Sequence, residues 1–158
     1  MSGFSNAAGA RSGVVNRTSI PGGYEIGQVV MNYGTSGNTA GTGHAGKYAW
    51  YTKTGRVVTI SASIYSSSVS GTWSGDLRIY GWPFVPLDAS FIFAVQSSGF
   101  ASGTNFPALG FLHANSTYAT LKTFNSGDGR AGCSTAVSAS GLSSYDQTYF
   151  TVTYNTTP

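Results

Sequence analysis

Charged residues are scarce in this chain of 158 residues: eight Lys and Arg with five Asp and Glu make up 8 % of it, against roughly 25 % in an ordinary soluble domain. There is a single Glu, with three Lys and six Leu. Exposed helix faces are built mainly from Glu, Lys, Ala and Leu, so this composition argues against a helical fold. No stretch approaches about 18 consecutive apolar residues, which excludes a membrane-spanning helix. Residues 1–13 lack the basic and apolar stretches of a secretory signal peptide, and we expect none.

Acidic residues are especially few, and this gives the chain a net charge of +3 and a pI near 9.1. The Lys and Arg residues occur singly rather than in a basic run, so the charge argues little for nucleic-acid binding. Cys133 is the single cysteine. It allows neither an intrachain disulfide nor a zinc site, and we interpret it as a small buried residue. Stability must therefore come from the core or from association between chains.

Residues 1–46 differ in composition from the rest of the chain. They are rich in Gly, Ser, Asn and Ala around one apolar segment, residues 23–33. A stretch of this kind is a flexible linker when alone in water. We expect an extended N-terminal arm with one short strand, clamped to a neighbouring subunit or partner protein. The alternative is a strand and loops packed on the chain's own body.

From residue 47 the pattern is typical of β-strands. Residues 47–53 and 56–65 are rich in β-branched and aromatic residues and flank Thr54-Gly55, which predicts a hairpin. Apolar and polar residues alternate in the second run. Further short runs follow, with a turn about every ten residues, at 76–80, 90–95, 107–113, 118–124, 131–139 and 148–154. We predict an all-β fold: a jelly-roll-like β-sandwich of about eight antiparallel strands over residues 47–158.

Candidate catalytic residues are few. His44 and His113 are the two histidines, and the chain has no Gly-x-Ser-x-Gly motif. A glycosidase needs two carboxylates, but Asp88 and Asp128 lie in turn-like sequence, where Asp is favoured for local hydrogen bonds. No His, Cys and Asp residues have the spacing of metal ligands. We expect no enzyme activity, metal or cofactor; a depolymerase with paired Asp residues, such as Asp76, Asp88, Asp128 and Asp146, is a less favoured alternative.

Aromatic residues, 14 % of the chain, are the strongest remaining signal. On a β-sandwich they fill the core, a subunit interface or a sugar-binding platform, and core or interface is the expectation. Trp73 and Trp82 lie in loop-like and proline-flanked sequence, so they could stack on sugars if they are exposed. We assign the following residues to a subunit interface or an aromatic surface: Trp73, Tyr80, Trp82, Phe84, Phe91 and Phe93.

Two segments are similar to phage virion proteins. Residues 46–61, Gly-Lys-Tyr-Ala-Trp-Tyr-Thr-Lys-Thr-Gly-Arg-Val-Val-Thr-Ile-Ser, resemble a hairpin of the form G-x-Y-x-(K/R)-x-G-(R/N)-x-V-x-(I/F). Residues 75–84, Gly-Asp-Leu-Arg-Ile-Tyr-Gly-Trp-Pro-Phe, resemble G-x-L-x-I-x-G-L-P-F, with Trp82 in place of the usual Leu. The resemblance covers residues 46–154 and its motifs are structural rather than catalytic. It implies a trimeric jelly roll of the kind found in capsid decoration proteins, head fibres and tail-fibre tips.

The expected function is that of a decoration (cement) protein, a homotrimer seated on the phage head. Its arm would contact the major capsid protein through Phe4, Arg11, Arg17, Tyr24 and Ile26. The alternative is the receptor-binding tip of a tail fibre, with a host surface glycan as its ligand. Either function places the protein on the virion surface after synthesis in the host cytoplasm, with no membrane partner. Contact of the arm with DNA is the least favoured alternative.

Overall fold

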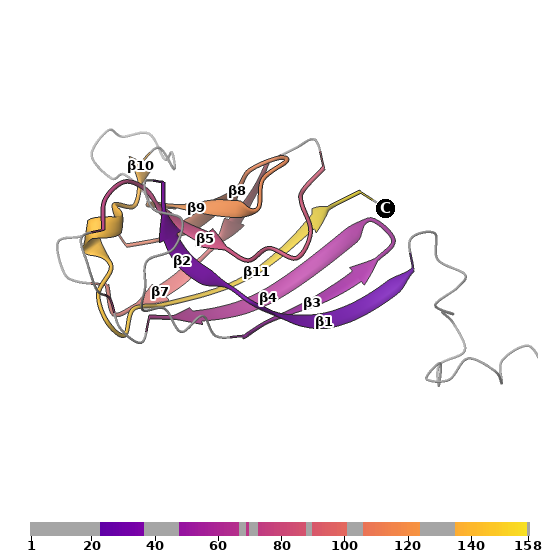
Figure 1. Ribbon diagram of the computed structural model, residues 1–158, viewed down its shortest axis with the longest axis horizontal. Helices are drawn as coiled ribbons and strands as arrows, with labels where there is room; N and C mark the ends of the chain where they lie inside the picture. The colour runs from indigo at the N-terminus through magenta and orange to yellow at the C-terminus, as the bar shows by residue number, and fades with distance from the viewer. Residues whose placement is uncertain are drawn as a thin grey trace, which may run out of the picture.

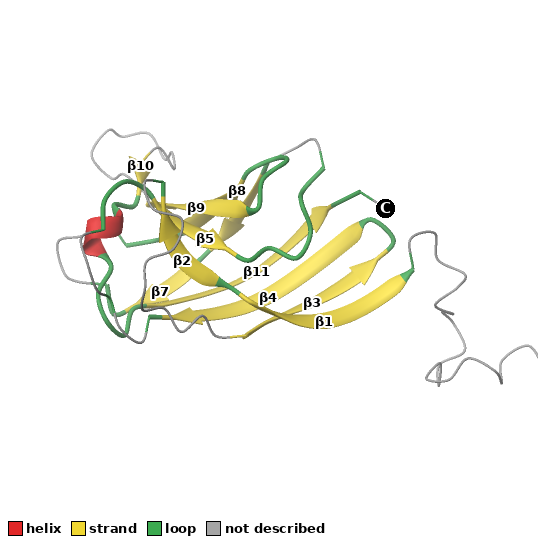
Figure 2. Ribbon diagram, viewed as in Figure 1, coloured by secondary structure: helices red, strands yellow, loops and turns green. Residues whose placement is uncertain are grey.

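The computed structural model describes residues 23–36, 48–66, 69, 73–87, 90–100, 106–123 and 135–157. In these residues the chain forms two antiparallel sheets and one short 3-10 helix, η1 (Ala139–Gly141), arranged as a β-sandwich (Figures 1 and 2). The predicted all-β class is confirmed. No helix among the described residues is long and apolar enough to cross a membrane.

The strands of the two sheets are listed here in their spatial order. Sheet A consists of β1 (Tyr24–Val30), β3 (Tyr48–Thr54), β4 (Val57–Tyr65), β11 (Gln147–Asn155) and β7 (Gln96–Ser98). Sheet B consists of β2 (Asn32–Thr35), β5 (Leu77–Tyr80), β9 (Tyr118–Thr123), β8 (Leu109–Leu112) and β6 (Phe91–Ala94), with β10 (Thr135–Ala136) paired to one end of β9.

The predicted hairpin is confirmed. Strands β3 and β4 pair in antiparallel register from Thr54↔Val57 onward, which leaves a loop of two residues, Gly55 and Arg56. Gly55 has φ +60°, a conformation that glycine adopts without steric cost and that tight hairpin loops require. Strands β8 and β9 form the second hairpin, with Asn115 at φ +54° in its loop.

Two segments of the chain each contribute one strand to sheet A and one to sheet B, and they lie at the two sides of the sandwich. Strands β1 and β2 are separated by Met31 alone, and each is an edge strand of its own sheet. On the opposite side, β6 and β7 are separated by Val95 alone and form the other two edges. Both linking residues are buried in the core, so each segment bends around the core as it passes from one sheet to the other.

The course of residues 24–35 corrects the predicted boundary between arm and sandwich. β1 pairs with β3 along its whole length, and β2 pairs with β5. The sandwich therefore begins at Tyr24 rather than at residue 47, and Tyr24 and Ile26 lie in an edge strand instead of a separate arm. The sequence did not indicate that residues 24–35 belong to the sheets. Their surroundings are rich in Gly, and the strands with which they pair lie far along the chain. Several other candidates lie outside the described residues: Phe4, Arg11, Arg17, His44, Asp88, Asp128 and Cys133.

Trp82 lies at the centre of an aromatic cluster between the sheets. Its ring centroid is 5.8 Å from that of Phe93, 5.7 Å from that of Phe150 and 6.0 Å from that of Tyr154. Its indole Nε1 donates a hydrogen bond of 2.9 Å to the Ile79 carbonyl. The indole is thus both packed and satisfied, as a buried Trp requires.

The proline-flanked segment after β5 therefore covers the core instead of forming an exposed platform. Tyr154 Oη donates to the Phe84 carbonyl at 2.9 Å, and Thr156 Oγ1 donates to the Val85 carbonyl at 2.8 Å. Burial corrects the prediction of a surface position for three of the assigned aromatic residues: Trp73, Trp82 and Phe93 are 7 %, 5 % and 5 % exposed. The other three, Tyr80, Phe84 and Phe91, are half-buried.

Candidate functional site

The outer face of sheet A has no charged side chain among the described residues. Side chains alternate between the two faces of a strand, and in β4 the inner positions are Val58, Ile60, Ala62 and Ile64, which are buried. The register of the neighbouring strands then defines the outer positions. Of these outer positions, we call the following residues the neutral face: Tyr24, Ile26, Gln28, Val30, Trp50, Thr52, Thr54, Val57, Thr59, Ser61, Ser63, Tyr149, Thr151, Thr153 and Asn155.

The neutral face carries most of the large apolar side chains that the described part of the chain exposes. Six of the ten such residues belong to it. Ile26, Trp50 and Val30 are 65 %, 62 % and 55 % exposed. Single exposed apolar residues are common on soluble proteins, but a group of them on one face marks an interaction surface.

Hydroxyl groups fill the middle of this face in cross-strand pairs. Thr59 Oγ1 lies 2.9 Å from Thr153 Oγ1, and Ser61 Oγ lies 2.9 Å from Thr151 Oγ1. Each pair joins β4 to β11. In each pair one hydroxyl already bonds the other. Covering a pair with a partner therefore displaces less bound water than covering two unpaired hydroxyls would.

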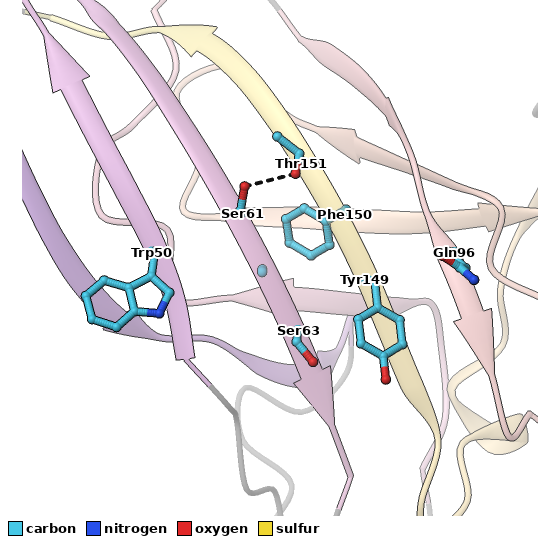
Figure 3. A pocket seen from close by; sticks show the side chains of 8 residues that line it. Trp50, Ser61, Ser63, Gln96, Tyr149, Phe150 and Thr151 are labelled. Carbon is cyan, nitrogen blue, oxygen red and sulfur yellow. Dashed lines mark hydrogen bonds between the residues drawn. The ribbon is translucent and has the colours of Figure 1, made fainter.

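An open pocket crosses β3, β4, β11 and β7 on the neutral face (Figure 3). Trp50 stands at one side and Tyr149 toward the other, with the Ser61–Thr151 pair and Ser63 between them. Its volume of about 550 Å³ lies within the usual range for ligand sites, roughly 300–1,000 Å³. The full lining is Trp50, Ser61, Ala62, Ser63, Gln96, Tyr149, Phe150 and Thr151.

This lining is suited to contact rather than to acid–base chemistry. It contains no carboxylate, imidazole or amine that could act as a general acid or base at neutral pH. Tyr149 donates its hydroxyl hydrogen to Gln147. What the pocket offers is one exposed indole, one phenol, hydroxyls and the Gln96 amide. Such a set can hold a neutral polar ligand, or the side chains of another protein.

The buried carboxylate of Asp146 has a structural role. It accepts hydrogen bonds from Ser143 N at 2.6 Å and Ser143 Oγ at 2.9 Å. Ser66 Oγ in turn donates to the Ser143 carbonyl at 2.6 Å, which ties the end of β4 to the turn before β11. Burial raises the pKa of Asp146 above its ordinary value, while the bonds from Ser143 oppose that rise.

No metal or catalytic cluster is found in the described ranges. No three His, Cys, Asp or Glu residues there lie close enough to hold a metal ion. Of the four Asp candidates, Asp76 and Asp146 are described, and no hydrogen bond or ion pair between described residues joins them. His113 Nε2 lies 2.9 Å from Thr120 Oγ1, on the outer face of sheet B.

The predicted and observed site residues coincide only in part. The structure places Tyr24 and Ile26 on the neutral face, as exposed parts of β1. Sequence reasoning did not single out Trp50, Val30 or Tyr149. The signal was present for Trp50, because it lies opposite Ser61, on the polar side of the alternation in residues 56–65. For Val30 it was absent, because the pairing of β1 with β3 is not readable from local sequence.

A scan against protein-family models finds no match to this chain, and a search of curated proteins finds none either.

Proposed function

We propose that the chain is a structural assembly protein, a decoration protein of a phage capsid that forms homotrimers of a jelly-roll-like domain and contacts the major capsid protein. The observation that carries the assembly role is the neutral face of sheet A. The resemblance of residues 46–61 and 75–84 to virion proteins supports the phage setting. In this proposal the neutral face is the surface through which copies of the chain associate.

The composition of the neutral face supports contact with protein. The centre of a protein–protein interface is depleted in charged residues and enriched in aromatic ones. Trp50, Tyr149 and Tyr24 are the aromatic residues here, and Trp is among the commonest energetic anchors of interfaces. Covering Trp50, Ile26 and Val30 would remove the three most exposed large apolar side chains of the face from water. Such burial stabilises a complex by roughly 25 cal/mol per Å² of apolar surface.

The edge of sheet A supports the same proposal. β1 is a seven-residue edge strand, and among the described strands it pairs with β3 alone. Soluble proteins usually protect such edges with charges, prolines or bulges. β1 carries a single charge, Glu25, and its carboxylate accepts a hydrogen bond from the Tyr51 hydroxyl. The edge is therefore open to a neighbouring chain beside the neutral face.

Oligomeric state tests the role of the face. We expect the purified protein to be a trimer in light scattering coupled to size exclusion, and Trp50→Lys to be monomeric with an unchanged far-UV circular dichroism spectrum. The matched control is Ile92→Lys, which places the same charge on an apolar residue that is 59 % exposed on β6 of sheet B. It should remain trimeric. A monomeric wild-type protein, or a trimeric Trp50→Lys variant, contradicts the proposal.

Location tests the phage setting. Antibody against this protein, labelled with gold and applied to purified phage particles, should mark the whole head. Label confined to the tail tip would instead support a receptor-binding role. Absence of label from both would contradict a virion function, even if the protein is a trimer.

The pocket beside Trp50 favours one second candidate, a glycan-binding module. An exposed indole with neighbouring hydroxyls and an amide is suited to stack on and hydrogen-bond a sugar ring. Binding of host surface oligosaccharide, followed by NMR titration, should be lost in Trp50→Ala and partly kept in Trp50→Phe. Equal binding by both variants would exclude this pocket as the sugar site.

A further inference from the structure

A second group of side chains with matched chemistry lies on the outer face of sheet B. Arg78 of β5, Thr120 of β9 and Phe111 of β8 are direct cross-strand neighbours, so their side chains stand in one row. Their sequence neighbours Ile79, Leu121 and Leu112 point into the core and are fully buried. We call this group the cationic cluster; its members are Arg78, Phe111, His113, Tyr118, Thr120 and Lys122.

Aromatic rings hold both cations of the cluster in place. The Arg78 guanidinium carbon lies 4.1 Å from the centroid of the Tyr118 ring, and Lys122 Nζ lies 5.2 Å from that of Phe111. The His113 ring lies between these two rings, with centroids 4.9 Å from Phe111 and 5.1 Å from Tyr118. Contacts of this kind stabilise a cation over a ring and fix its position. The two charges are therefore positioned before any ligand arrives.

The positive charge of the cluster is not balanced by a carboxylate within the described parts of the chain. Arg78 Nε is buried and finds no hydrogen-bond acceptor among the residues that the structure describes. Arg78 Nη1 reaches only the Tyr80 hydroxyl, at 3.5 Å, which is too long for a strong bond. A buried donor without a partner costs free energy, so the guanidinium is held in this position at the expense of one hydrogen bond.

The pKa of His113 is consistent with this uncompensated positive charge. Its pKa is lowered first by burial and then by the charges of Arg78 and Lys122. No described carboxylate opposes these two charges. Both cations thus act on the same small region of the face, where an anion would be attracted.

We infer that the cationic cluster binds the carboxylate groups of an acidic glycan, with the Arg78 fork on a carboxylate, Lys122 as a second positive charge, and the Tyr118 hydroxyl toward the sugar hydroxyls. A planar guanidinium matches a carboxylate with two parallel hydrogen bonds. The cluster lies on the face of the sandwich opposite the neutral face. It therefore leaves the proposed assembly surface free, and the inference does not rest on the proposed function.

Two observations favour a glycan over nucleic acid. Nucleic-acid sites present positive charge along a track, with ring faces free for stacking on bases. Here the two cations come from the paired strands β5 and β9, and they cover faces of the Tyr118 and Phe111 rings. A compact pair of charges next to hydroxyl groups is suited to one or two carboxylates of a polysaccharide.

The experiment uses the full chain and a defined probe, an oligogalacturonate of about eight sugars, in calorimetric titration at low salt. The same oligosaccharide with its carboxylates methyl-esterified is the neutral control. We expect binding to the acid form only, weakened roughly tenfold by Arg78→Gln and by Lys122→Gln. Arg56→Gln removes one charge from the exposed β3–β4 loop and should bind as the wild type does. If Arg78→Gln fails to fold, Lys122→Gln still provides the test.

Four outcomes would overturn the inference. These are no binding of the oligogalacturonate, equal binding of its methyl ester, an equal loss of affinity in Arg56→Gln, and tighter binding of an oligodeoxythymidylate of equal charge. The last outcome would assign the cluster to nucleic acid. None of them depends on the oligomeric state, so the proposed function can fail or hold separately.

Discussion

At the scale of single residues, Phe93 depends on having a glycine opposite it. Phe93 of β6 and Gly110 of β8 are direct cross-strand partners. A Cβ atom at position 110 would overlap the Phe93 ring, because the ring crosses the Gly110 backbone on its way into the core. That path brings the ring centroid to 4.8 Å from the centroid of Phe150 and allows the contact with Trp82.

Gly110→Ala should therefore destabilise the protein. The added methyl group must displace a ring that is packed on two other aromatic rings, and overpacking of this kind costs about 1–3 kcal/mol. Urea denaturation followed by circular dichroism measures the loss. Ala94→Ser adds one atom at an exposed position of β6 and should change the free energy of unfolding by less than about 0.5 kcal/mol. Equal stability of the two variants would show that the ring lies elsewhere.

The buried carboxyl of Asp146 makes stability depend on pH. Its pKa in the folded protein is raised by burial, so the folded state binds the proton more tightly than the unfolded state does. Stability is then greatest below the unfolded pKa of about 3.9 and decreases as pH rises through the folded value. Asp146→Asn keeps a group that can bond Ser143 N and Ser143 Oγ without the charge.

We expect Asp146→Asn to gain stability relative to the wild type as the pH is raised from 3 to 7. Urea denaturation at several pH values measures the difference. Asp76→Asn removes the same charge from a half-exposed residue and controls for the net charge of the protein. A gap between wild type and Asp146→Asn that stays constant from pH 3 to 7 would contradict the raised pKa.

At the scale of elements, the two strand-switching segments hold the sheets together. Residues 24–35 and 91–98 each contribute an edge strand to both sheets, and their linking residues Met31 and Val95 are buried. Gly81 fits against the first bend, where a Cβ atom would overlap the Val30 carbonyl oxygen. The sheets are therefore joined covalently along both sides by extended chain and packed together by the core.

Met31→Ala should destabilise the fold by about 2–5 kcal/mol, the usual cost of truncating a buried Met. The cavity would form at the bend between β1 and β2, where the backbone has little freedom to collapse into it. The matched truncation is Ile92→Ala in the other segment; Ile92 is exposed, so its loss should cost far less. Comparable losses of free energy in the two variants would contradict the buried position of Met31.

Local sequence predicted those elements whose partners are close along the chain. The β3–β4 hairpin was predictable, because Gly55, the β-rich composition of both runs and the alternation in the second run are local signals. β1 and β2 were not assigned to the sheets, because β2 finds its partner β5 more than forty residues later. Trp82 was misjudged for a similar reason: its proline-flanked context indicates a loop, and only the packing of β6 and β11 shows that the loop covers the core. The neutral face depends on register, which residue order alone does not reveal.

At the scale of the whole molecule, the three tryptophans are divided between the interior and one surface. Trp73 and Trp82 are buried, and Trp50 projects from the neutral face. In Trp50→Phe, the remaining fluorescence should be shifted to the blue and only weakly quenched by acrylamide, because both other indoles are shielded from water. Strong quenching in that variant would show that Trp73 or Trp82 is exposed. Because Phe is also aromatic, Trp50→Phe should keep most of the apolar area that the neutral face offers to a partner.

The position of β11 has a consequence for how the chain is made in the cell. This strand lies inside sheet A, between β4 and β7, and it pairs with β4 along nine residues. A ribosome delivers β11 more than eighty residues after the end of β4, so the emerging chain exposes the unpaired flank of β4 over that part of its synthesis. Premature termination would release a product with that flank still open, which is a template for aggregation.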